Sequence, residues 1–144
     1  MTTFTIVLHI EIEAEPSAVH AAIRDAAGLR AWWTPDVTAT GEGVGARLTF
    51  RFGDGGPDME MTALEPDRYV EWRCMSGPWD GMRFSFRTEP HARGTALRFE
   101  HADWPDQGPF HGHCNAKWGF FLGVSLKQLM EKGTGVPFPN EPKV

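Results

Sequence analysis

The first clear pattern in the chain is a two-residue alternation near its start. Between residues 4 and 14, apolar side chains take every second position, and polar or charged side chains fill the positions between them. This alternation predicts a strand with one buried face. Pro16 suits the first turn of a short helix, Gly28 breaks that helix, and residues 29–33 are predicted to add a further helical turn.

The same two-residue period returns five more times along the middle of the chain. Clusters of Gly, Pro and Asp separate the repeats, which is typical of strands that fold back on one another. The sequence therefore predicts an antiparallel meander, with six strands in all. The five later strands are expected at residues 46–52, 58–64, 68–75, 82–87 and 97–101.

A helical pattern replaces the alternation in residues 108–132, which we predict to form one helix of about six turns. One arc of this helix mixes aromatic residues with a His, a Cys and a Ser, as a pocket wall would. An ordinary packed helix with tolerated small polar groups fits the pattern as well. The arc holds His111, Cys114, Trp118, Phe121, Leu122, Ser125 and Leu129. A second strip of Gly112, Ala116, Gly119 and Gly123 predicts a close neighbouring element, because glycine inside a helix is otherwise unfavourable.

These elements predict an α+β fold, with two short helices after the first strand. An antiparallel sheet with one polar face has to cover its other face, and the long helix is the only adequate cover. We expect it to lie across the concave side of a curved sheet. The length of 144 residues fits a single domain, residues 1–144, with a Gly/Pro-rich tail at 133–144.

The net charge and the cysteines indicate which partners and which cellular compartment to expect. The net charge of −5 and the absence of a basic run argue against nucleic acid. The N-terminal residues alternate and carry acids, which matches neither a signal peptide nor a membrane span. Cys74 and Cys114 lie far apart without metal-type spacing, so we expect a reduced, cytoplasmic protein. Ten Phe and six Trp exceed what an ordinary core of this size needs.

Several motifs resemble those of a known superfamily. They are AEPSAV at residues 14–19, LRAWW at 29–33, GT at 94–95, HADWPD at 101–106 and WGFFLGVSLKQLMEKGTGVPFP at 118–139. Together they are similar to the SRPBCC superfamily, which includes START and birch-pollen-allergen-like proteins. Within it, the chain resembles the family related to the C-terminal domain of the activator of the ninety-kilodalton heat-shock chaperone ATPase. The resemblance implies a helix-grip fold, in which a six-stranded sheet wraps around the long helix and encloses a mostly apolar cavity.

That cavity predicts a site for a small hydrophobic or aromatic molecule. Its polar groups would be His101, His111 and Ser125, which would fix the orientation of the ligand. The competing interpretation is that the rings only fill the core. The expected ligand-binding residues are Trp33, Phe50, Phe52, Trp72, Phe84, Phe86, Phe99, His101, His111, Cys114, Trp118, Phe121 and Ser125.

An enzyme is the main alternative to a binding protein. His101 or His111 could serve as a base in a cyclase or aromatase, but no nucleophile elbow, phosphate loop or dinucleotide motif is present. The sequence therefore favours binding over catalysis. No cofactor or metal is expected, since His111 and His113 point about 200° apart on a helix. A co-chaperone-like interaction module is a third possibility, and we expect a monomer or homodimer.

Overall fold

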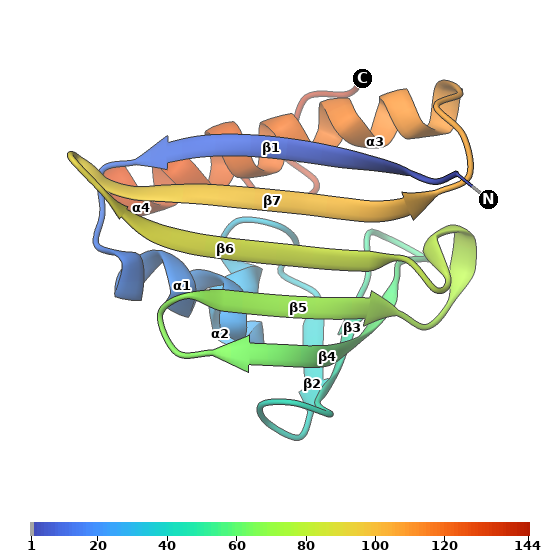
Figure 1. The fold of residues 1–144 in the computed structure, drawn as a ribbon, viewed down its shortest axis with the longest axis horizontal. Helices are drawn as coiled ribbons and strands as arrows, with labels where there is room; N and C mark the ends of the chain where they lie inside the picture. The colour runs from blue at the N-terminus through green and yellow to red at the C-terminus, as the bar shows by residue number, and fades with distance from the viewer. Residues whose placement is uncertain (1) are drawn as a thin grey trace.

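Seven strands form one antiparallel sheet in the computed structural model, which describes residues 2–144. Their order across the sheet is β1-β7-β6-β5-β4-β3-β2. In Figure 1, β2 and β3 turn across the other strands, so the sheet is strongly curved. The strands are β1 Phe4–Ile12, β2 Val37–Thr40, β3 Arg47–Phe50, β4 Asp58–Glu65, β5 Tyr69–Cys74, β6 Arg83–His91 and β7 Gly94–Trp104.

The expectation of six strands was wrong by one, because β2 was missed. This strand is only four residues long, and Val37 is its only buried member. It pairs with β3 from Val37 opposite Phe50 to Thr40 opposite Arg47, and it forms one edge of the sheet. A short edge strand that buries a single side chain carries no alternating pattern to detect.

The two short helices after β1 and the long C-terminal helix all lie on one side of the sheet (Figure 1). Two short helices follow β1, as predicted: α1, Pro16–Arg24, and α2, Ala26–Arg30. Their boundary was predicted wrongly, because the break falls at Asp25 and Gly28 lies inside α2. A short 3-10 turn, η1 at Gly77–Trp79, connects β5 to β6. The predicted long helix consists of α3 Pro109–Phe120, the π-helical segment η2 Phe121–Leu126 and α4 Lys127–Lys132, and it ends at Gly133, whose φ is 87°.

The π-helical segment changes which side chains the long helix buries. Cys114, Trp118 and Ser125 face inward, as the predicted arc requires. Beyond them Leu126 is fully buried, whereas Leu129, predicted to face inward, is only partly buried. A π-helix has wider turns than an α-helix, so the face presented by the following residues shifts.

The last turns of the long helix cover the free edge of β1. Lys127 donates from Nζ to the backbone oxygen of Glu11, and Glu131 accepts from the backbone nitrogen of Glu13 at 2.8 Å. Edge strands expose unpaired backbone groups that can recruit other chains. These two side chains occupy such groups at one end of β1.

The glycine strip of the long helix does not mark a close approach, contrary to the expectation. A Cβ placed on Gly112 or Gly119 would meet nothing within 4 Å, and one on Gly123 would meet only Ile10, at 3.5 Å. The tight contact lies at Gly135 in the tail. A Cβ there would lie 2.4 Å from the backbone oxygen of Ala31, so only glycine lets the tail pack against the end of α2.

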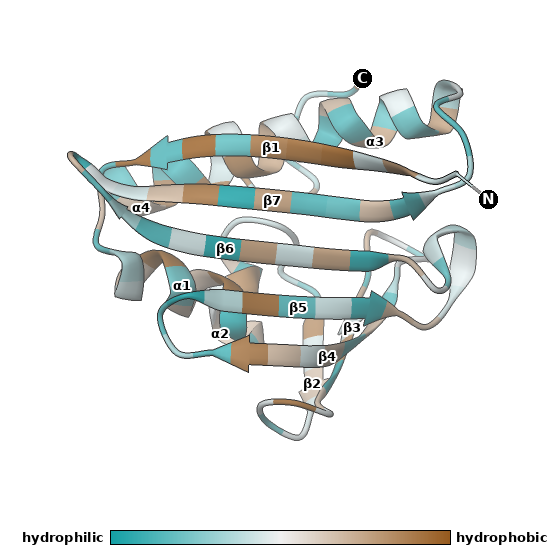
Figure 2. Ribbon diagram, viewed as in Figure 1, coloured by the Kyte–Doolittle hydropathy of each residue, from teal (hydrophilic) through white to brown (hydrophobic). Residues whose placement is uncertain are grey.

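The hydrophobic core fills the space between the concave face of the sheet and the helices. Hydropathy alternates along β6 and β7, as expected for strands with one buried face (Figure 2). The largest fully buried side chains include Trp32, Trp72, Phe50, Phe84, Phe86 and Phe99. The aromatic residues thus dominate the interior of the domain.

Candidate functional site

Five of the predicted ligand-binding rings pack against one another inside the core. Trp72 lies at the centre of this group, with ring centroids 4.8 Å from Phe86 and 5.5 Å from Phe50. Phe86 in turn lies 5.0 Å from Phe99. The five rings, Phe50, Trp72, Phe84, Phe86 and Phe99, are at most 1% exposed, and none lines the pocket described next.

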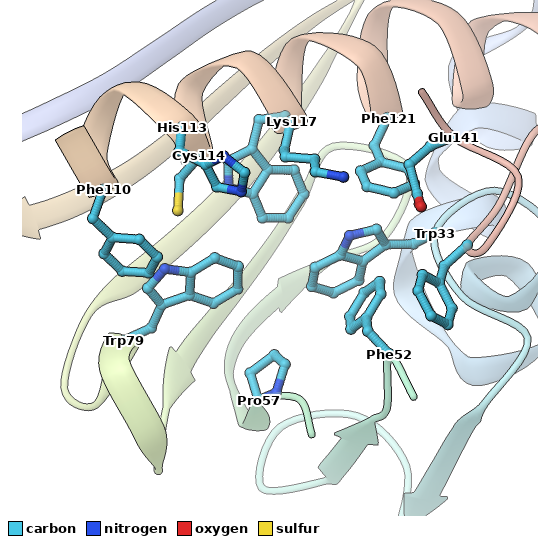
Figure 3. A pocket seen from close by; sticks show the side chains of 12 residues that line it. Trp33, Phe52, Pro57, Trp79, Phe110, His113, Cys114, Lys117, Phe121 and Glu141 are labelled. Carbon is cyan, nitrogen blue, oxygen red and sulfur yellow. The ribbon is translucent and has the colours of Figure 1, made fainter. Parts of the chain in front are cut away.

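A pocket of about 270 Å³ lies on the flank of α3, between that helix, η1 and the C-terminal tail (Figure 3). It continues into a neighbouring groove that shares four of its lining residues. Five predicted site residues line it: Trp33, Phe52, Cys114, Trp118 and Phe121. The other lining residues are Pro57, Trp79, Phe110, His113, Lys117, Phe138 and Glu141.

Three indole rings form much of the pocket wall. The ring centroid of Trp118 lies 4.9 Å from that of Trp33 and 6.1 Å from that of Trp79. Trp33 follows α2, and its backbone nitrogen donates to the oxygen of Leu29 at 3.0 Å. Figure 3 shows Trp33 and Trp79 facing the pocket from opposite sides. Such a wall offers flat apolar faces for a planar molecule.

Hydrogen bonds from Ser125 hold the tail against the pocket. The hydroxyl of Ser125 donates to the backbone oxygen of Trp32 at 2.7 Å and accepts from the backbone nitrogen of Val136 at 2.8 Å. Two residues further on, the backbone nitrogen of Phe138 donates to the oxygen of Trp33 at 2.8 Å. Ser125 is fully buried and does not line the pocket, so its hydroxyl positions the tail wall.

His101 lies in the core beside the pocket. Trp118 donates from its indole nitrogen to Nδ1 of His101 at 3.1 Å, which leaves the proton on Nε2, 3.2 Å from the sulfur of Met82. Burial lowers the pKa of His101 to about 3, and nearby His111 acts in the same direction. Nδ1, the nitrogen of His101 that could accept a proton, therefore already accepts a hydrogen bond from Trp118. Together with the low pKa, this makes the imidazole a weak base at neutral pH.

The other predicted polar residues lie in different settings. His111 does not line the pocket, and its ring packs edge-on against Trp104 at 5.0 Å with a buried, unpartnered Nε2. Cys114 does line the pocket. Burial raises the pKa of its thiol to about 11, and the neighbouring Trp79 indole acts in the opposite direction. A thiol with so high a pKa is a poor nucleophile.

The basic and acidic side chains of the pocket were not predicted. Lys117 and His113 line it from α3, and Glu141 lines it from the tail. Within residues 2–144, Lys117 forms no ion pair. Glu141 Oε2 and Trp79 Nε1 are both buried without a hydrogen-bond partner. The pocket thus joins an aromatic wall to polar groups that have no protein partner.

Residues 2–144 show neither a metal cluster nor a membrane-spanning helix. No cluster of three or more His, Cys, Asp or Glu side chains is suited to hold a metal ion. No helix in this range combines the length and apolar character needed to cross a membrane.

Comparison with known proteins identifies relatives of this fold. The family described as polyketide cyclase / dehydrase and lipid transport matches residues 3–131. The chain is also similar to the solution structure of the Aha1 dimer from Colwellia psychrerythraea, at 38% identity and a TM-score of 0.83, covering 92% of this chain and 99% of that one. This relationship confirms the predicted link to the chaperone-activator family. No curated protein matches the sequence.

More distant structures share the fold alone. Protein SSP2350 from Staphylococcus saprophyticus is 17% identical with a TM-score of 0.75, covering 92% of this chain and 96% of that one. DynU16, a putative protein in the dynemicin biosynthetic locus, is 21% identical with a TM-score of 0.72, covering 91% of this chain and 48% of that one. The helix-grip architecture is therefore common to chains with little sequence in common.

Proposed function

Because the chain belongs to the polyketide cyclase / dehydrase and lipid transport family, we propose that it binds a small, largely hydrophobic or aromatic molecule. The pocket walled by Trp33, Trp79 and Trp118 is the proposed site. This wall of three indoles is the observation that carries the proposal (Figure 3). Ligand pockets are typically concave and apolar, with a few polar groups that fix orientation.

The proposed site lies on the flank of the long helix and not in the central cavity expected from the sequence. Aromatic residues fill the space between the sheet and the long helix, where that cavity was expected. Phe50, Trp72 and Phe99 are fully buried there and pack on other rings. The pocket volume of about 270 Å³ is close to the lower end of the roughly 300–1,000 Å³ typical of ligand sites. We therefore propose a ligand the size of two or three fused rings.

Calorimetric titration with naphthalene tests this proposal, since naphthalene is planar, apolar and small enough for the pocket. Saturable binding supports it, and the absence of binding contradicts it. Phe110 and Val124 offer matched variants, because both lie on the long helix and are 47% and 45% exposed, but only Phe110 lines the pocket. Phe110→Ala should weaken binding, whereas Val124→Ala should leave it unchanged.

Catalysis of the cyclase or aromatase kind is the alternative function. The hydrogen bond from Trp118 and the lowered pKa give His101 little capacity to act as a base. His113, Lys117 and Glu141 line the pocket and would be the available proton donors and acceptors. An aromatase-like turnover that survives His101→Phe but is lost in Glu141→Leu would support this alternative.

We also propose a homodimer in a reducing compartment, the cytoplasm. The similarity to a dimeric Aha1 supports the first part. Both cysteines, Cys74 and Cys114, are buried and free, which fits the second. Light scattering on the purified protein tests the dimer, and a mass of one chain across the micromolar range would contradict it.

A further inference from the structure

The polar side chains that line the pocket indicate which polar group the ligand should carry, in addition to its hydrophobic part. Resting on the function proposed above, we infer that the pocket selects a planar aromatic molecule carrying a neutral hydroxyl group, held between Lys117 and Glu141.

Glu141 has an unusual position for a charged residue. Its Oε2 is buried and has no hydrogen-bond partner, although the residue lies in the tail near solvent. Leaving a charged acceptor buried and unpaired is costly, so native structures normally supply a partner for such a group. Oε2 itself is out of reach of a group the size of water. The Glu141 carboxylate lines the pocket, so a bound molecule can donate to its other oxygen, Oε1.

Lys117 brings hydrogen-bond donors to the same pocket. Its side chain lines the pocket from α3 and forms no ion pair within residues 2–144. In Figure 3 the Lys117 ammonium extends from α3 toward Phe121, and the Glu141 carboxylate lies on the other side of the Phe121 ring. The indole nitrogen of Trp33 turns toward Phe121 as well.

These side chains together define the polar group that a ligand should carry. Lys117 and Trp33 offer donors, and Glu141 offers an acceptor. A hydroxyl has two acceptor lone pairs and one donor, so its hydrogen-bonding groups match the donors and the acceptor that the pocket offers. A carboxylate would pair with Lys117 but would face the negative charge of Glu141, and a cation would face the positive charge of Lys117.

The aromatic wall indicates the shape of the rest of the ligand. Trp33 and Trp79 face the pocket from opposite sides (Figure 3). The Trp118 ring also lines the pocket, with its centroid 4.9 Å from that of Trp33 and 6.1 Å from that of Trp79. A flat ring system can lie in this space with its hydroxyl directed to Lys117 and Glu141. An aliphatic alcohol has no ring face to stack against the three indoles, so the geometry favours an aromatic alcohol.

A series of four probes with one ring system tests the inference by calorimetry: naphthalene, 2-naphthol, 2-methoxynaphthalene and 2-naphthoate. We expect 2-naphthol to bind about tenfold more tightly than naphthalene, since its hydrogen bonds involve charged partners. The methyl ether keeps the acceptor but loses the donor to Glu141, so it should bind more weakly than 2-naphthol. The carboxylate should bind most weakly of the three substituted probes.

Two variants then assign the preference to the named side chains. Lys117→Met and Glu141→Leu should each bring 2-naphthol close to the affinity of naphthalene. Lys132→Met, on the same helix, and Glu42→Leu, in the β2–β3 loop, carry the same changes away from this pocket and should keep the preference. Circular dichroism checks that all four variants fold.

The outcomes separate this inference from the proposed function. If naphthalene binds but 2-naphthol binds no more tightly, the hydroxyl preference is wrong and the hydrophobic site stands. If 2-naphthoate binds most tightly, the pocket selects an anion and the inference is overturned. If none of the four probes binds, both proposals fail.

Discussion

The indole nitrogen of Trp118 donates a 3.1 Å hydrogen bond to Nδ1 of His101, and both side chains are almost completely buried. This bond joins the long helix to β7. It also connects the pocket wall to the core, because Trp118 lines the pocket and His101 does not. The orientation of the central indole therefore depends on a side chain that the ligand does not reach.

Replacement of His101 by Phe should destabilise the fold by about 1–3 kcal/mol, because the Trp118 N–H would then be buried without an acceptor. Trp118→Phe should also destabilise it. In the double variant neither partner is left unpaired, so its loss should be smaller than the sum of the two single losses by about 1 kcal/mol. Urea denaturation measures all three, and strictly additive losses would contradict the coupling.

Folding stability should fall as the pH drops below about 6.5. Burial lowers the pKa of His101 from 6.5 to about 3, so the unfolded chain takes up a proton that the folded chain does not. This difference costs about 1.4 kcal/mol per pH unit, or up to about 2.5 kcal/mol between roughly pH 6.5 and 4.5. This contribution to the free energy of unfolding is fully present above about pH 6.5, the pKa in the unfolded chain. It is lost progressively as the pH falls toward about 3, the pKa in the folded chain.

The same denaturation series in His101→Phe serves as the control. Buried His20 also has a lowered pKa, so part of the slope should persist in the variant. The paired carboxylates, among them Glu71 and Glu100, have lowered pKa values and contribute mainly below about pH 4.5. An equal slope in the wild type and the variant between pH 5 and 6.5 would show that His101 is not responsible.

Replacement of Ser125 by Ala should loosen the tail more than the rest of the fold. The change removes the hydrogen bonds to Trp32 and Val136, and the buried backbone groups left unpaired should cost about 2 kcal/mol. Because Phe138 and Glu141 line the pocket, the affinity for naphthalene should fall as well. Hydrogen exchange should become faster at Val136, and unchanged exchange there would contradict this anchoring role.

Cys114 should resist alkylation although it lines the pocket. Burial raises the pKa of its thiol from 9.0 to about 11, which lowers the thiolate fraction at pH 8 by about 100-fold. Cys74 is also buried and has a raised pKa. Iodoacetamide followed by mass spectrometry should label both only after unfolding, and rapid native labelling at Cys114 would contradict the assigned environment.

The fold was largely predictable because its long elements carry clear periods. The alternation of β1, β6 and β7 and the inward arc of the long helix from Cys114 to Ser125 appear directly in the sequence. The missed strand, β2, buries only Val37 and has no period to detect. The π-helical segment was not predictable from a wheel that assumes about 100° per residue, which is why Leu129 was placed too far inward.

The pocket was harder to predict because its wall comes from distant and irregular segments. Trp79 belongs to the 3-10 turn, and Phe138 and Glu141 belong to the tail, where no periodic pattern indicates burial. A helical wheel marks the side that faces the core, so it excluded His113 and Lys117, which lie on the flank of the helix. The mixed arc of the long helix and the aromatic surplus were the signals of the site. The arc supplies Cys114, Trp118 and Phe121 to the pocket, whereas most of the other rings serve the core.

The π-helical segment has a consequence for how this chain tolerates changes of length. It separates the pocket-lining half of the helix, with Cys114 and Trp118, from the half that carries Lys127 and Glu131 to the edge of β1. A π-helical turn holds about one residue more than an α-helical turn, so a one-residue deletion within Phe121–Leu126 can convert the segment to α-helix and leave both halves facing as they do. A one-residue insertion has no such outlet and would turn the second half by about 100° relative to the first. The pocket would then keep its wall on α3, while the β1 edge would lose its cover and become open to pairing with another chain. Shortening this segment should therefore be tolerated, whereas lengthening it should alter self-association without altering what the pocket binds.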